Sequence, residues 1–92
     1  MVLSEINKIM KLLKFYGTYC NPCKSLTKII NEIEFKDNFS VVSCDVEDEW
    51  ELADKFKIKN VPTCVLIDEN ENEVKRWVGT FNVKEELKDF IE

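Results

Sequence analysis

Hydrophobic and polar residues alternate along the chain in short blocks, which predict an alternation of strands and helices. Short apolar runs bounded by polar turns predict four strands, at residues 11–16, 39–46, 63–67 and 73–78. Helical spacing and helix-favouring end residues predict three helices, at residues 21–34, at residues 47–56 and from residue 82 onward. Residues 1–10 fit a short helix or an extended arm, so they are treated as a variable N-terminal segment.

Apolar spacing and end residues identify the first and last of these helices. The first is expected to bury one face, formed by Leu26, Ile29, Ile30 and Ile33. Pro22 stands at its start, where a missing N–H costs no helical hydrogen bond. Asn82 and Glu85 form a capping pair that predicts the start of the last helix, whose apolar residues are Leu87, Phe90 and Ile91.

The order of the elements predicts a small α/β fold. A strand–helix–strand crossover from Lys11 to Asp45 implies parallel strands joined with right-handed chirality. The polar turn at residues 68–72 joins the last two strands as an antiparallel hairpin. We therefore expect one domain over residues 1–92, with a mixed four-stranded sheet flanked by helices on both faces.

Composition and charge exclude several classes of function. The net charge of −5 argues against a nucleic-acid-binding protein, because such proteins neutralise phosphates with Lys and Arg. The chain contains no histidine, which removes the commonest general base and zinc ligand. No window approaches the roughly 18–20 apolar residues of a membrane helix, and no secretion signal is recognisable at the start. We therefore expect a cytoplasmic protein without a membrane contact.

The motif that carries chemistry is Cys20-Asn21-Pro22-Cys23, between a predicted strand and the start of a helix. Two residues three apart in the first turn lie on the same side of a helix, close enough for a disulfide. The helix dipole and the free N–H groups at the helix start favour the thiolate form of Cys20. We expect Cys20 to attack a substrate disulfide and Cys23 to resolve the mixed disulfide.

The alternatives for this pair are a zinc site and a static disulfide. A zinc site needs a second Cys-x-x-Cys or histidine partners, whereas Cys44 and Cys64 are isolated in strand-like runs. A static disulfide is disfavoured in a reducing compartment. We expect no metal site, and we interpret Cys44 and Cys64 as inert core thiols kept apart by the strand at residues 11–16.

Three motifs in order resemble the thioredoxin family. The run FYGTYCNPCK, residues 15–24, is similar to the aromatic and Cys-Gly-Pro-Cys-Lys segment of that family. The run NVPT, residues 60–63, resembles the loop that holds the family's cis-proline, and Val78-Gly79 resembles the pair after its last strand. The likeness covers nearly all of residues 11–92 and implies a thioredoxin-like fold of minimal size, close to that of glutaredoxins.

The resemblance also implies a substrate-binding surface. Pro62 would be the cis-proline that faces the two cysteines, and Val61 would present its backbone to an extended substrate segment. Tyr19 and Gly79 would complete this surface. Asn21 departs from the family, which has glycine there, and this difference is expected to adjust the redox potential.

Lys14 is the main departure from the family, which has a buried Asp at this position and a Lys at about Ser43. The family's Asp helps to move a proton to and from the resolving cysteine. Burial lowers the pKa of a lysine unless an anion pairs with it. Lys14 therefore either lies beneath the two cysteines and favours the Cys23 thiolate, or extends to solvent without a role. The sequence leaves both possibilities open.

The resemblance implies a thiol–disulfide oxidoreductase that reduces protein disulfides. It implies a monomer with no bound cofactor, which receives its electrons from a partner reductase. One alternative is a glutaredoxin-type enzyme that takes electrons from glutathione. Another is a non-catalytic interaction module that retains only the fold.

Overall fold

The structure is a computed structural model, and it describes residues 8–92. The helix and the extended arm considered for residues 1–10 therefore lie mostly outside the described residues. Lys8 and Ile9 have no regular secondary structure, and Met10 begins the first strand.

The elements follow the predicted order. They are β1 (Met10–Tyr16), α2 (Asn21–Asn31), β2 (Phe39–Asp45), α3 (Trp50–Lys55), β3 (Thr63–Asp68), β4 (Glu73–Val78), α4 (Val83–Glu86) and the 3-10 helix η1 (Lys88–Phe90). Each predicted strand is confirmed to within one residue at either end. The helices are shorter than predicted.

Local hydrogen bonds explain the shorter helices. At the end of α2, the N–H of Glu32 and of Ile33 donate to carbonyls three residues back, which tightens and ends the helix. Before α3, the Asp45 carboxylate accepts from the N–H of Glu47 at 2.8 Å. This side-chain bond holds a turn where the pattern predicted the first helical residues.

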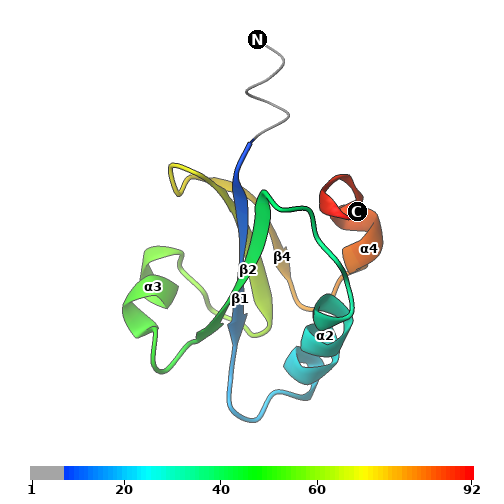
Figure 1. Cartoon of the computed structure of the whole chain (residues 1–92). Coiled ribbons are helices and arrows are strands. Elements are labelled where there is room, and N and C mark those ends of the chain that lie inside the picture. The colour runs from blue at the N-terminus through cyan, green and yellow to red at the C-terminus, as the bar shows by residue number, and fades with distance from the viewer. Residues whose placement is uncertain (1–7) are drawn as a thin grey trace.

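The sheet has the strand order β2-β1-β3-β4. Strand β1 pairs in parallel with β2 and antiparallel with β3, and β3 and β4 form the predicted hairpin. Figure 1 shows α3 on one face of this sheet and α2 with α4 on the other. The mixed sheet with helices on both faces is therefore confirmed, and β1 separates the strands that carry Cys44 and Cys64.

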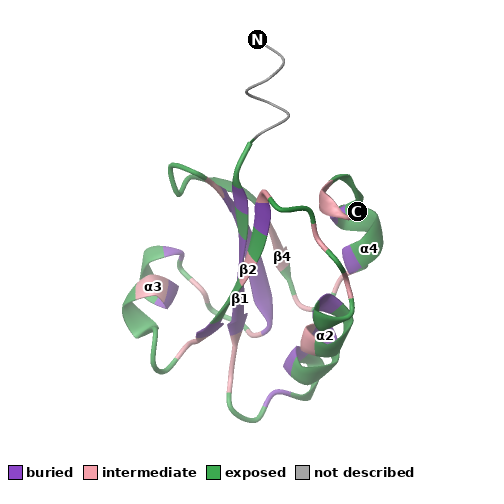
Figure 2. Cartoon of the chain, in the orientation of Figure 1, coloured by how far each residue is buried: buried purple, intermediate pink, exposed green. Residues whose placement is uncertain are grey.

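Alternation along β1 builds a core on each face of the sheet (Figure 2). Met10 and Leu12 pack on the side of α2 and α4, whereas Leu13 and Phe15 pack on the side of α3. All four are at most 4% exposed. Lys14 follows the same alternation, so it lies on the α2 side.

One expectation about buried residues was wrong, and one buried residue was missed. Ile29 is 41% exposed, and Cys23 joins Leu26 and Ile30 as the buried residues of α2, because the helix contacts the sheet along a narrower stripe than predicted. In the last helix, Val83 is buried as deeply as Leu87, although the pattern did not assign it to the core. The cap is confirmed, since the Asn82 side chain accepts from the N–H of Glu85 at 3.3 Å.

Candidate active site

Cys20 occupies the N-cap of α2, a position usually taken by Ser, Thr, Asp or Asn. Its backbone is extended, and its sulfur accepts a hydrogen bond from the N–H of Cys23 at 3.2 Å. The Cα atoms of the two cysteines are 5.2 Å apart, and their sulfurs form a disulfide. A local interaction therefore positions the two cysteines: the Cys20 sulfur caps the helix that begins at Asn21.

The two cysteines are recessed, and Cys23 is the deeper. Cys20 is 8% exposed and Cys23 is 4% exposed, whereas Tyr19 beside them is 99% exposed. The pair is therefore bordered on the outside by one projecting aromatic side chain.

The loop before β3 approaches the cysteine loop from the opposite side. The bond between Val61 and Pro62 is cis, as the resemblance implied. A Cβ at Gly17 would lie 3.3 Å from a Val61 methyl group, a tight contact that glycine avoids, so the two loops pack closely here. Sequence reasoning did not assign Gly17 a role in the site, although its position directly after the β1 run was visible.

Backbone contacts bring Gly79 to the same place. The Gly79 N–H donates to the Pro62 carbonyl at 2.8 Å, and Gly79 has a φ of +88°, a region that favours glycine. The Thr63 hydroxyl, which sequence reasoning did not identify, donates to the Asn60 carbonyl at 2.7 Å. The structure therefore brings Val61, Pro62 and Gly79 together beside the cysteine loop.

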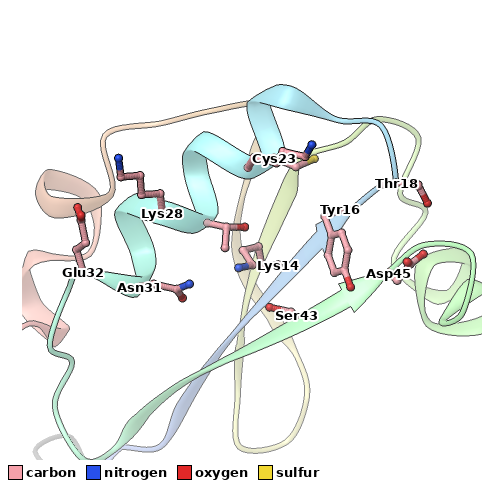
Figure 3. Close-up of a pocket in the computed structure, with 12 residues that line it drawn as sticks. Lys14, Tyr16, Thr18, Cys23, Lys28, Asn31, Glu32, Ser43 and Asp45 are labelled. Carbon is pink, nitrogen blue, oxygen red and sulfur yellow. The ribbon is translucent and has the colours of Figure 1, made fainter.

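Lys14 is buried at the centre of the sheet. It is 3% exposed, and its register partners are Ser43 on β2 and Cys64 on β3. Burial lowers the pKa of Lys14, and the nearby Cys64 partly opposes this change. Figure 3 shows Lys14 between α2 and the strands, in an open pocket of about 830 Å³ that Cys23 also lines.

Cys44 and Cys64 are buried free thiols. Burial raises the pKa of Cys64 to about 12, and the Lys14 ammonium partly offsets the effect. Burial, with the charge of Glu49, also raises the pKa of Cys44. Both thiols are therefore protonated at neutral pH.

Alkylation at about pH 8 is expected to spare Cys44 and Cys64 in the reduced native protein. With a pKa of about 12 for Cys64, roughly one molecule in ten thousand carries its thiolate at that pH. Peptide mapping by mass spectrometry after iodoacetamide treatment measures this protection, and the same treatment in guanidinium should label both residues. Labelling of native Cys64 as fast as in guanidinium would contradict the assigned burial.

Stability should depend on the same thiol at high pH. Because the folded state raises the pKa of Cys64 from 9.0 to about 12, the unfolded state loses this proton first as the pH rises. Wild type should therefore lose stability relative to Cys64→Ala as the pH increases above about 9. Denaturant unfolding of both proteins at several alkaline pH values tests whether the stability difference changes in this direction.

No cluster of three or more His, Cys, Asp or Glu side chains is arranged to hold a metal ion among residues 8–92. No helix of these residues has the length and apolar content needed to cross a membrane.

Comparison with known proteins places these features in a family. The family model described as Thioredoxin matches residues 2–92. The Bacillus subtilis protein named Thioredoxin is 29% identical over 90 residues, which cover 96% of this chain and 85% of that protein. Thioredoxin Y1, chloroplastic, of Arabidopsis thaliana is 34% identical over 76 residues, covering 80% of this chain but 44% of that protein.

A larger relative and a solved structure extend the comparison. The Mycobacterium leprae protein named Bifunctional thioredoxin reductase/thioredoxin is 34% identical over 70 residues, which cover 74% of this chain and 15% of that protein. The solved structure of a mutant thioredoxin from Halobacterium salinarum superposes with a TM-score of 0.77 at 25% identity, covering 98% of this chain and 83% of that one. With its paired cysteines at the start of α2, the chain belongs to the thioredoxin family and is a thiol–disulfide oxidoreductase.

Proposed function

We propose that this single domain reduces protein disulfides, with Cys20 as the nucleophile and Cys23 as the resolving cysteine. The Cys20 thiolate attacks one sulfur of the substrate disulfide, which forms a mixed disulfide and frees one substrate thiolate. The Cys23 thiolate then attacks the Cys20 sulfur, which releases the second substrate thiolate and leaves the Cys20–Cys23 disulfide. Two electrons pass to the substrate, whose thiolates take up protons from water.

The position of the Cys20 sulfur is the observation that carries the proposal. It accepts the Cys23 N–H at the start of an eleven-residue helix. The same N–H and the helix dipole would stabilise a thiolate there. Such a sulfur is a suitable nucleophile at neutral pH and a suitable leaving group when the disulfide is reduced again.

The substrate segment is proposed to lie across Val61, Pro62, Tyr19 and Gly79. Val61 is half-buried beside Gly17, and Pro62 is linked to Gly79 through its carbonyl. Tyr19 offers an exposed ring next to Cys20. An extended peptide could add its backbone to the Val61 edge in the manner of a further strand. We also propose a monomer, since one chain contributes all these groups.

A partner reductase is the proposed electron donor, and the cytoplasm is the proposed location. The Mycobacterium leprae relative, whose name joins a thioredoxin reductase to a thioredoxin, supports this kind of donor. A reducing compartment also suits two buried free thiols beside a redox pair. The Arabidopsis relative is named as a chloroplast protein, so relatives do not share one compartment.

The choice of donor can be tested with insulin as the disulfide substrate. We expect turnover when NADPH and a thioredoxin reductase regenerate the dithiol, and at least about tenfold slower turnover with glutathione and glutathione reductase. NADPH oxidation and insulin precipitation report the two steps. Faster turnover with glutathione would favour the glutaredoxin-type alternative, and no turnover with either donor or with dithiothreitol would favour the interaction module.

Lys14 is proposed to favour the thiolate of Cys23, since both residues line one pocket. We expect Lys14→Met to slow alkylation of Cys23 in a reduced Cys20→Ser background by about three- to tenfold and to move its pH profile upward. Lys11→Met, on the same strand but exposed, is the matched control. An unchanged rate and profile would remove Lys14 from the mechanism.

A further inference from the structure

The pocket beneath α2 contains the Lys14 ammonium, which has no ion-pair partner among residues 8–92. The ion-paired cations of residues 8–92 are Lys55, Lys75, Arg76 and Lys88. Lys14 as a residue is only 3% exposed, but its ammonium is not fully enclosed, since no fully buried side-chain nitrogen among the described residues lacks a partner. Such a charge is costly to bury unless an anion accompanies it. The neighbour that could compensate it, Cys64, is a protonated thiol at neutral pH. In the oxidised protein, where Cys23 is held in the disulfide, no anion among residues 8–92 pairs with Lys14.

Lys14 faces a space of suitable size. Figure 3 shows its side chain in the pocket between α2 and the two strands β1 and β2. The volume, about 830 Å³, lies within the range of roughly 300–1,000 Å³ typical of small-molecule sites. Ser43, its register partner on β2, and Asn31 on α2 add a hydroxyl and an amide that can donate hydrogen bonds.

The surrounding side chains indicate the charge and shape of a ligand. The charged lining residues are three lysines, Lys14, Lys24 and Lys28, and two carboxylates, Glu32 and Asp45. Their net charge of about +1 matches a singly charged anion better than a multiply charged one such as phosphate. A single negative charge is matched by Lys14. The Tyr16 ring and the Thr27 methyl group also line the pocket, and they offer apolar contact beside the charged group.

We propose that this pocket binds a small organic carboxylate, whose charged group pairs with the Lys14 ammonium and whose apolar body lies between α2 and the sheet edge. Neither Val61 nor Pro62, where the protein substrate is proposed to lie, lines this pocket, although Gly17, which does, lies against Val61. The pocket meets the redox pair only at Cys23, which is one of its lining residues.

Titration of the oxidised protein with hexanoate tests the proposal, with hexanamide as the neutral probe of matched shape. We expect saturable changes in amide chemical shifts for residues around Lys14, Thr27 and Ser43. Hexanoate should bind about tenfold or more tightly than hexanamide, because a charge-assisted bond is formed only by the carboxylate. Equal binding of the two probes would overturn the proposal without any variant.

Substitutions of Lys14 test whether this residue causes the preference for hexanoate over hexanamide. Lys14→Met should abolish the preference for hexanoate, and Lys14→Gln serves the same purpose if the methionine variant does not fold. Lys11→Met, an exposed lysine on the same strand that does not line the pocket, should retain the preference. A preference that survives both Lys14 variants, or phosphate binding tighter than hexanoate, would overturn the assignment. The readout is binding, so failure here would leave the proposed reductase activity standing.

Discussion

Replacement of Cys20 by Ser is expected to reduce insulin reduction by roughly a thousandfold or more, to the rate without protein. The hydroxyl of serine is almost wholly protonated at neutral pH and is a poor nucleophile toward sulfur. The change is nearly isosteric at a position that caps α2, so the fold should persist. Stopped assays with dithiothreitol as the electron source measure the loss without any partner enzyme.

The Cys23→Ser variant separates the two proposed roles. It should still attack a substrate disulfide but should then remain bound to it, because no second sulfur can displace the substrate. Non-reducing electrophoresis would show this mixed disulfide, and Cys20→Ser should not form one. If Cys23→Ser turned over normally, or if only Cys20→Ser trapped substrate, the assignment of the two cysteines would be wrong.

Replacement of Phe15 by Ala is expected to lower the free energy of unfolding by about 3–5 kcal/mol. Phe15 is fully buried, and its ring centroid lies 6.3 Å from that of Phe56, which packs in the core on the α3 side. The loss compares with a total of about 5–15 kcal/mol for a domain of ordinary stability. Denaturant unfolding followed by Trp fluorescence measures it.

Two further variants control for this result. Tyr19→Ala removes an aromatic ring that is 99% exposed, and it should change stability by no more than about 0.5 kcal/mol. Phe15→Leu keeps most of the buried volume and should cost less than about 1.5 kcal/mol. Similar losses for Phe15→Ala and Tyr19→Ala would contradict the burial that distinguishes the two rings.

Most of the fold could be predicted from local sequence patterns. Strand bounds were predictable because β1 and β3 are mainly apolar runs bordered by Gly17 or by polar turns. The hairpin and the Asn82 cap were also local, since each depends on residues a few positions apart. Helix ends were less predictable, because competing bonds such as that from Glu47 to Asp45 depend on loop geometry.

The reactive pair could be located from local sequence. A three-residue spacing at a helix start places Cys23 beneath the Cys20 sulfur through backbone geometry alone, without help from the rest of the fold. The sequence also identified Lys14 as the unusual residue, because a lysine inside an apolar run is visible in the chain.

The surroundings of these residues, in contrast, depend on contacts between distant segments. The contact of Gly17 with Val61 and the bond from Gly79 to Pro62 join segments far apart in the chain. The depth of Lys14 and the pocket that it faces likewise follow from how α2 lies over β1 and β2. The spacing of residues along a helix or strand determines which face each side chain occupies. The burial of that side chain and the residues it contacts depend on segments far away in the sequence, whose positions the spacing does not reveal.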